Sequence, residues 1–171
     1  MGNERFALRG LYAITPETAD TPSLVASVEQ CLAGGARLVQ YRAKSLAPAL
    51  ALAQARLIAG RCRRYQVPLI VNDSLDLAFA SGADGVHLGS GDGDARRARE
   101  QFPGGIIGVS CYASPACAAR ARDDGADYVA IGSVFASATK PGAPTAPLAA
   151  IEGAKRAGGL PVCAIGGIDR R

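Results

Sequence analysis

The 171-residue sequence predicts an α/β protein of the (β/α)8 TIM-barrel class, with about seven βα units in this chain. Short apolar runs alternate with Ala-rich helical stretches, the pattern of a parallel sheet covered by helices. The apolar runs lack polar alternation, as expected of strands buried on both faces. A Gly-Ala motif that closes a helix and precedes a strand recurs at Gly35, Gly82 and Gly125. Its spacing corresponds to about 23 residues a unit, the size of a compact barrel unit.

Seven strands and six helices are expected along the chain. Thr21 is predicted to cap the first helix with Pro22 at its first position, and Arg61, Arg63 and Arg64 favour the C-terminal end of the second helix. The strands are predicted at 11–14, 38–41, 68–71, 85–88, 106–109, 127–131 and 162–165. The helices are predicted at 22–32, 46–65, 75–80, 94–101, 115–122 and 147–156.

The length and composition are those of one folded domain, 1–171. Hydrophobic residues make up 49% and charged residues 20%, so a packed core is expected. Aromatic residues make up only 5%, Trp is absent and the net positive charge is mild, so no nucleic-acid partner is expected. A net charge of +4 suits a small anionic ligand. No apolar run reaches the ~20 residues of a membrane span, so no membrane partner is expected. Five cysteines without a CxxC motif are typical of reduced thiols in a cytoplasmic protein.

Basic and amide side chains follow the second predicted strand. Gln40, Arg42 and Lys44 stand at alternate positions, so extended backbone would place them on one face. Arg binds phosphate oxygens bidentately and Lys binds as a point charge, so this strip suits a polyphosphate. A solvated loop is the alternative interpretation.

Carboxylates follow the third and fourth predicted strands. Asn72 and Asp73 come after one strand, and Asp92 comes after the next. One carboxylate from each of two adjacent loops is a typical Mg²⁺ site, with phosphate oxygens and waters completing the shell. Alternatively, Asp73 or Ser74 caps the helix that follows. His87 lies within an apolar strand and is interpreted as a core or rim histidine rather than a base.

Phosphate-binding candidates also follow the last three predicted strands. Ser110 follows the fifth strand, and Gly167 offers backbone N–H groups after the seventh. The long loop after the sixth strand, where hydroxyls flank a lysine, contains Ser137, Thr139 and Lys140. The sequence shows no Ser/His/Asp arrangement, which argues against a hydrolase. Metal-assisted departure of a diphosphate fits this set of residues.

The sequence resembles the thiamine-phosphate synthase (thiamine monophosphate pyrophosphorylase) family in motifs that run along the whole chain. Six of these are Leu-Tyr-Ala-Ile-Thr at 11–15, Val-Gln-Tyr-Arg-Ala-Lys at 39–44, Pro-Leu-Ile-Val-Asn-Asp at 68–73, Gly-Ala-Asp-Gly-Val-His-Leu-Gly at 82–89, Thr-Lys at 139–140 and Ala-Ile-Gly-Gly-Ile at 164–168. The resemblance implies a (β/α)8 barrel that couples hydroxymethylpyrimidine diphosphate with thiazole phosphate in the presence of Mg²⁺. The products are thiamine phosphate and pyrophosphate.

The resemblance also implies a role for each candidate residue. Gln40, Arg42, Lys44 and Asn72 would bind the pyrimidine diphosphate, and Asp73 and Asp92 would bind Mg²⁺. Ser110 and Lys140 would stabilise the leaving pyrophosphate. Ser137, Thr139 and Gly167 would contact the thiazole phosphate.

Two other functions stay open at this point. A thiazole tautomerase-like paralogue would share the fold, but such paralogues tend to lose the metal carboxylates and the lysine, which this chain keeps. A non-catalytic phosphate-binding remnant is the second, because we expect the barrel to be incomplete at its C-terminal end, without an eighth βα unit. The oligomeric state is not predicted.

Overall fold

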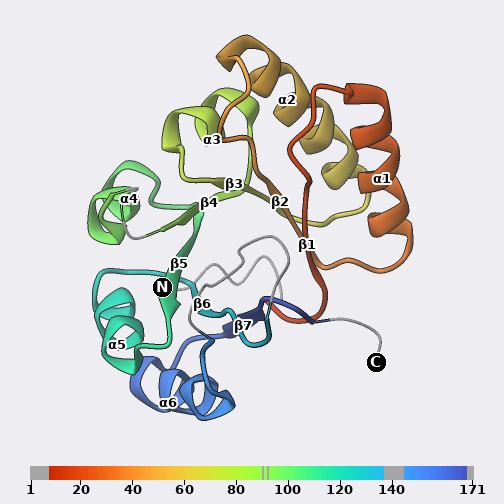
Figure 1. Cartoon of the computed structure of the whole chain (residues 1–171). Helices are drawn as coiled ribbons and strands as arrows, with labels where there is room; N and C mark the ends of the chain where they lie inside the picture. Colours follow the sequence, from red (N-terminus) through yellow and green to blue (C-terminus); the bar gives the residue numbers. More distant parts are fainter. Residues whose placement is uncertain (1–7, 90, 92, 137–144, 169–171) are drawn as a thin grey trace. The chain divides into compact units, whose positions relative to one another are not determined.

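The computed structural model describes residues 8–89, 91, 93–136 and 145–168, and it divides into two compact units. The first unit comprises residues 1–87 and 104–106, and the second comprises 88–103 and 107–171. Seven strands and six helices alternate in the described ranges, as the sequence predicts (Figure 1). No helix within these ranges is both long enough and apolar enough to cross a membrane.

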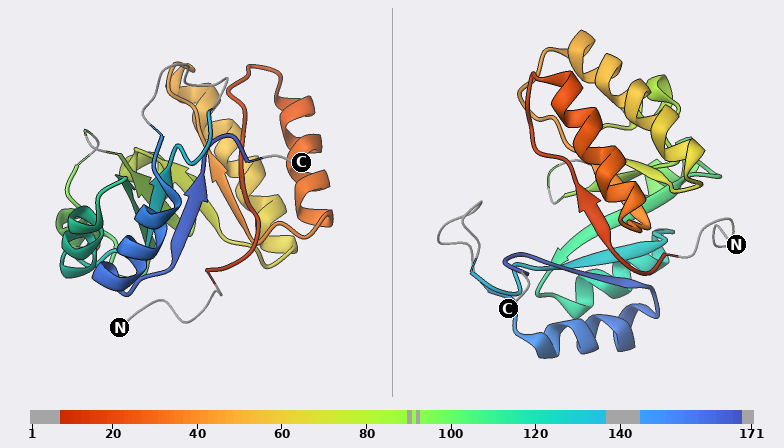
Figure 2. Two further views of the ribbon diagram at one scale, coloured as in Figure 1. Left: turned by 60° about the horizontal axis from the view of Figure 1, so that its bottom comes forward. Right: turned by 90° about the vertical axis from the view of Figure 1, so that its right-hand side faces the viewer.

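The first unit is a parallel sheet with helices on one side (Figure 2). Its strands are β1 (Tyr12–Ile14), β2 (Leu38–Tyr41), β3 (Leu69–Asn72) and β4 (Gly85–Leu88), paired in chain order. Its helices are α1 (Thr21–Ala33), α2 (Pro48–Arg64) and α3 (Leu75–Ser81). The register pairs Tyr41 with Val71 and Asn72 with His87, so the carboxyl ends of these strands share one edge of the sheet.

The described part of the second unit contains three parallel strands and three helices. The elements are α4 (Ala95–Gln101), β5 (Ile106–Tyr112), α5 (Pro115–Asp123), β6 (Tyr128–Gly132), α6 (Leu148–Gly158) and β7 (Val162–Ile165). Helix α6 packs closely on α5, because a Cβ at Gly158 would lie only 3.0 Å from the carbonyl oxygen of Ala118. Small side chains such as Ala121 and Ala154 fill this contact. The alanine-rich composition therefore serves close helix packing.

The helix caps differ from the prediction at one position. Asp20, not Thr21, caps α1, and its carboxylate accepts a hydrogen bond from the backbone N–H of Ser23 at 3.1 Å. Ser74 caps α3, accepting from the N–H of Leu77 at 3.1 Å. The second result leaves the neighbouring Asp73 carboxylate available for another partner.

The recurring Gly-Ala motif carries an aspartate that ties neighbouring strands together. The Asp84 carboxylate accepts from the Leu69 N–H at 2.9 Å, and the Asp84 N–H donates back to the Leu69 carbonyl at 2.9 Å. Asp127 forms the same two bonds with Ile107, both at 2.7 Å. At the remaining copy, Arg37 makes only the backbone donation, to Leu11. The aspartate carboxylate therefore bonds the neighbouring strand in two of the three copies of the motif.

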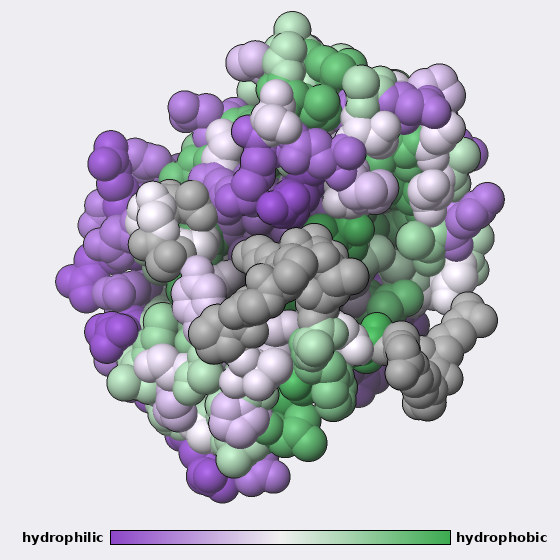
Figure 3. Space-filling view, viewed as in Figure 1, coloured by the Kyte–Doolittle hydropathy of each residue, from purple (hydrophilic) through white to green (hydrophobic). Residues whose placement is uncertain are grey.

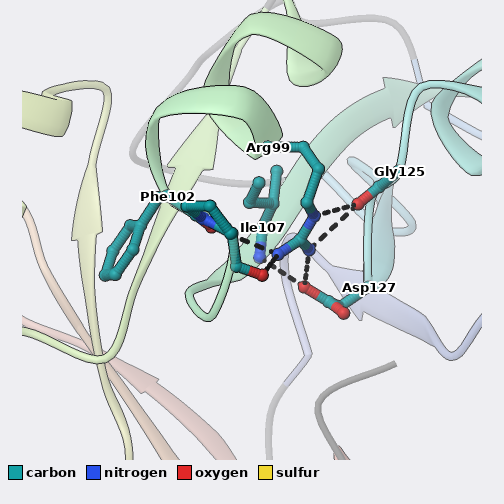
Figure 4. A network of polar contacts seen from close by, with 6 residues as sticks. Arg99, Phe102, Ile107, Gly125 and Asp127 are labelled. Carbon is teal, nitrogen blue, oxygen red and sulfur yellow. Dashed lines mark hydrogen bonds and ion pairs between the residues drawn. The ribbon is translucent and has the colours of Figure 1, made fainter. Parts of the chain in front are cut away.

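Arg99 of α4 pairs with Asp127 and adds further hydrogen bonds to this contact between strands (Figure 4). Its guanidinium lies 2.6 Å from the Asp127 carboxylate and donates to the carbonyl oxygen of Gly125 at 3.0 and 3.1 Å. It also donates to the carbonyl oxygens of Phe102 and Pro103. The Asp127 side chain is only 8% exposed, so this ion pair is shielded from solvent.

We expect Asp127→Ala to lower the free energy of unfolding by about 2–4 kcal/mol, because it leaves Arg99 and the Ile107 N–H without their shielded partner. Asp123→Ala is the matched control, since its carboxylate is 61% exposed and pairs with the neighbouring Arg122. The control should lose less than about 1 kcal/mol. Urea unfolding of both variants measures the difference, and equal losses would contradict a structural role for the Arg99–Asp127 pair.

Candidate active site

The loops that follow β2 and β3 meet through an ion pair between two of the predicted site residues. The Nζ atom of Lys44 lies 2.8 Å from Oδ2 of Asp73. The Lys44 side chain is 51% exposed and the Asp73 side chain 24%, so both remain open to a ligand from solvent. Hydrophilic residues also gather on the surface where Figure 1 draws β2 and β3 (Figure 3). A cation and a carboxylate at adjacent strand ends are the groups that a diphosphate with a bound cation requires.

Asp73 turns the chain sharply at the end of β3. Its φ is +66°, a left-handed conformation that aspartate tolerates better than most residues. Its backbone N–H donates to the carbonyl oxygen of His87 at 2.8 Å. Because Ser74 caps the following helix, the Asp73 carboxylate does not have that task and pairs with Lys44 instead.

Gln40 lies inside β2, within the predicted strand 38–41, so it does not follow the strand as Arg42 and Lys44 do. Its side chain is 4% exposed, and its Nε2 atom donates to the hydroxyl of Tyr12 at 3.0 Å. Arg42 and Lys44 follow the strand, as predicted, and Asn72 is the last residue of β3. The predicted strip therefore begins as a buried side chain in the sheet and continues as two basic residues in a loop.

Ser110 also lies inside a strand, because β5 extends to Tyr112 rather than ending at residue 109. The register with β6 shifts between Ser110 and Tyr112, and Tyr112 has a φ of +54°. Such irregularities redirect side chains near the end of a strand. The extra length of β5 thus places Ser110 next to a bulge at its carboxyl end.

Gly166 and Gly167 form a tight turn after β7. Their φ values are +102° and +63°. The carbonyl oxygen of Gly166 accepts from the N–H of Phe135 at 3.0 Å, and that of Ile165 accepts from the N–H of Val134 at 2.9 Å. These bonds tie the turn after β7 to the segment after β6. A side chain at either glycine would collide with that segment.

The remaining predicted site residues lie outside the described residues. They are Asp92, Ser137, Thr139 and Lys140. Within the described ranges, no three His, Cys, Asp or Glu side chains are grouped so that they could hold a metal ion. Asp73 is therefore the one predicted metal ligand that the structure describes, and the metal site stays a prediction.

The buried thiols and the histidine show no arrangement for nucleophilic catalysis. All five cysteines are free thiols. Burial, together with the neighbouring Cys117, raises the pKa of Cys111, and burial raises the pKa of Cys62 to about 12. Both thiols are then protonated at neutral pH and poor nucleophiles. His87 is 7% exposed within β4, in agreement with its interpretation as a core histidine.

Sequence reasoning missed the residues around β1 that contact this site. Tyr12 binds Gln40, and Thr15 accepts a hydrogen bond from the backbone N–H of Arg42 at 3.0 Å. Glu17 accepts two hydrogen bonds from Ser45. Thr15 directly follows the first strand, so the rule that strand ends carry the site could have identified it.

Parallel strands that alternate with helices and carry polar groups at their carboxyl ends are typical of enzymes of the (β/α)-barrel class. The family model described as thiamine monophosphate synthase matches residues 11–171 of this sequence. The chain therefore belongs to the thiamine monophosphate synthase family.

Individual relatives agree with this assignment. The chain is 54% identical to the thiamine-phosphate synthase of Aromatoleum aromaticum over 94% of this chain and 78% of the relative. It is 51% identical to that of Methylobacillus flagellatus over 94% of this chain and 77% of the relative. A solved thiamine phosphate pyrophosphorylase from Pyrococcus furiosus superposes with a TM-score of 0.82 at 34% identity, covering 93% of this chain and 75% of that one. These similarities confirm the predicted fold class and family.

Proposed function

We propose that this chain couples hydroxymethylpyrimidine diphosphate with thiazole phosphate, giving thiamine phosphate and pyrophosphate. The bond between the pyrimidine methylene carbon and the diphosphate oxygen breaks, and the thiazole nitrogen forms a new bond to that carbon. Membership of the family supports this transferase activity in thiamine biosynthesis. The observation that supports it is the Lys44–Asp73 pair, a lysine and a carboxylate at the ends of adjacent strands.

The first unit supplies the proposed binding residues for the pyrimidine diphosphate. Arg42 and Lys44 bind its phosphate oxygens, and Lys44 is held near the site by Asp73 at 2.8 Å. Gln40 and Asn72 offer amide groups at neighbouring strands. Because Gln40 is buried and bonded to Tyr12, its amide is already oriented before the substrate arrives.

The donor chemistry of Asp73 and Asp92 fits Mg²⁺. This ion prefers one or two protein carboxylates, with waters and substrate phosphate oxygens as its other ligands. Bound there, Mg²⁺ would neutralise charge on the diphosphate and make it a better leaving group. The Asp73 carboxylate is partly exposed, and Ser74 rather than Asp73 caps α3, so this carboxylate is suited to the task.

The second unit supplies groups for the leaving pyrophosphate and the thiazole phosphate. Ser110 and Lys140 stabilise negative charge as the pyrophosphate departs. Ser137, Thr139 and Gly167 bind the thiazole phosphate, and Gly167 is exposed, so a phosphate can approach its backbone N–H. No nucleophilic side chain is needed, because the thiazole nitrogen itself forms the new bond to the pyrimidine methylene carbon.

The free thiols and the absence of CxxC spacing support a cytoplasmic location, which we propose for this enzyme.

The proposed activity predicts thiamine phosphate and pyrophosphate in equal amounts when the purified chain is given both substrates and Mg²⁺. Either substrate alone should yield neither product. Removal of divalent cations with EDTA should abolish turnover, and added Mg²⁺ should restore it. Chromatography of thiamine phosphate together with an enzymatic pyrophosphate assay measures both products. Full activity in EDTA would contradict the proposed metal, and product with one substrate alone would contradict the reaction.

A further inference from the structure

Two side chains after β1 contact the loop that carries Arg42 and Lys44. The hydroxyl oxygen of Thr15 accepts from the backbone N–H of Arg42 at 3.0 Å. The Oε1 atom of Glu17 accepts from the backbone N–H of Ser45 at 2.5 Å and from its hydroxyl at 2.7 Å. These contacts span 27 and 28 residues of sequence and fall on either side of Lys44.

The segment that provides these contacts is itself firmly anchored. Thr15 is 6% exposed, and its N–H donates to the carbonyl oxygen of Gln40 at 2.9 Å. The fully buried Gln54 of α2 donates to the Thr18 carbonyl and the Thr21 hydroxyl, both at 3.0 Å. Its Oε1 atom accepts from the hydroxyl of Tyr41 at 2.8 Å. The segment 15–21 is therefore fixed to both the sheet and α2.

We propose that Thr15 and Glu17 are positioning residues of the pyrimidine diphosphate site, which hold the loop 42–45 so that its two basic side chains meet the diphosphate. This inference rests on the proposed function. A loop held by hydrogen bonds at Arg42 and at Ser45 loses less conformational entropy when Lys44 binds an anion. Neither Thr15 nor Glu17 needs to touch the substrate.

Because Glu17 is charged, a positioning role and a purely electrostatic role predict different effects of its substitution on ligand binding. Both hydrogen bonds from Ser45 enter the same oxygen atom, and they lower the pKa of the Glu17 carboxyl. Glutamine retains an oxygen acceptor at this position but has no charge. A negative charge beside an anionic ligand would by itself weaken binding. A purely electrostatic role therefore predicts tighter binding in both Glu17→Ala and Glu17→Gln, whereas positioning predicts weaker binding in Glu17→Ala alone.

The test compares Glu17→Ala and Glu17→Gln in the coupling assay, with the KM of each substrate measured at saturation of the other. We expect Glu17→Ala to raise the KM for pyrimidine diphosphate about five- to tenfold with kcat within about twofold, the pattern of lost binding common to ground and transition states. The KM for thiazole phosphate should not change. Glu17→Gln should stay within about twofold of the wild type for both substrates. Thr15→Val should resemble Glu17→Ala, and Thr15→Ser should restore the wild-type value.

Glu29→Ala is the matched control, because Glu29 pairs with Arg61 on the surface of the same unit, in the second half of α1. It should leave both KM values unchanged. An unchanged KM for pyrimidine diphosphate in Glu17→Ala, or an equal rise in both KM values, would overturn the inference.

A calorimetric titration with pyrophosphate and Mg²⁺ separates failure of this inference from failure of the proposed function. If the wild type does not couple the substrates but binds pyrophosphate more tightly than Glu17→Ala does, the reaction is wrong and the positioning role stands. If the two proteins bind pyrophosphate equally, or neither binds it, the positioning role is wrong.

Discussion

Asp73→Asn should reduce kcat by a factor of about 10²–10³, the scale of removing one electrostatic stabiliser of the transition state. Asparagine is chosen because it tolerates the left-handed backbone that Asp73 adopts at a φ of +66°. It is also nearly isosteric, so the substitution removes the charge with little change in backbone or packing. The proposed cation would lose a ligand, and Lys44 would lose its ion-pair partner.

Asp76→Asn is the control for this experiment. Asp76 lies in the first turn of α3, three residues from Asp73, and has no proposed part in the site. Its substitution should leave kcat within about twofold of the wild-type value, since a single charge near a helix end contributes little to stability and this one has no proposed contact with substrate. A drop of less than tenfold in Asp73→Asn at saturating Mg²⁺ would show that the Asp73 charge does not stabilise the transition state.

Gly166→Ala should raise the KM for thiazole phosphate more than tenfold and should also lower stability. The backbone there has a φ of +102°, and a Cβ would lie 2.7 Å from Cα of Ser133. Because backbone atoms cannot move aside cheaply, the turn that carries Gly167 must shift. Displaced N–H groups no longer converge on a phosphate. The KM for pyrimidine diphosphate should change much less, since its proposed ligands lie in the first unit.

Gly159→Ala is the control for Gly166→Ala, because it introduces the same kind of backbone strain without a steric clash. Gly159 ends α6 with a φ of +64°, but no atom lies within 4 Å of the Cβ that alanine would add. This control should lose about 1 kcal/mol of stability from strain and keep both KM values. If it raised the KM for thiazole phosphate as much as Gly166→Ala, the effect would come from general loss of stability.

The fold could be predicted from sequence because its signals are local. Apolar runs, caps such as Ser74 and glycines such as Gly82 each lie within a few residues of the boundary they define. One error was also local, and another depended on strand pairing. The prediction of Thr21 as the cap of α1 was wrong, because the adjacent Asp20 is an equally good capping residue and takes that position. The bulge that lengthens β5 past Ser110 depends on pairing with β6, which no local pattern reports.

The site could be predicted only in part, because its supporting contacts are long-range. Arg42, Lys44 and Asp73 could be identified from their chemistry at predicted strand ends. The contact of Glu17 with Ser45 joins residues 28 apart, and neither residue type alone points to it. Likewise, the sequence showed that the Gly-Ala motif repeats, but not that its aspartates form hydrogen bonds with a neighbouring strand. The sequence does not show which distant loops lie side by side, because that depends on the register of the sheet.

The central claim is that the strand ends of the first unit bind the pyrimidine diphosphate, and calorimetric titration of Lys44→Ala tests it most directly. With Mg²⁺ present, this variant should bind hydroxymethylpyrimidine diphosphate about 10- to 100-fold more weakly than the wild type, the loss of one charge-assisted contact. Lys155→Ala, which removes a lysine from the last turn of α6, should bind it as the wild type does. Equal affinities of the wild type and Lys44→Ala would contradict the account.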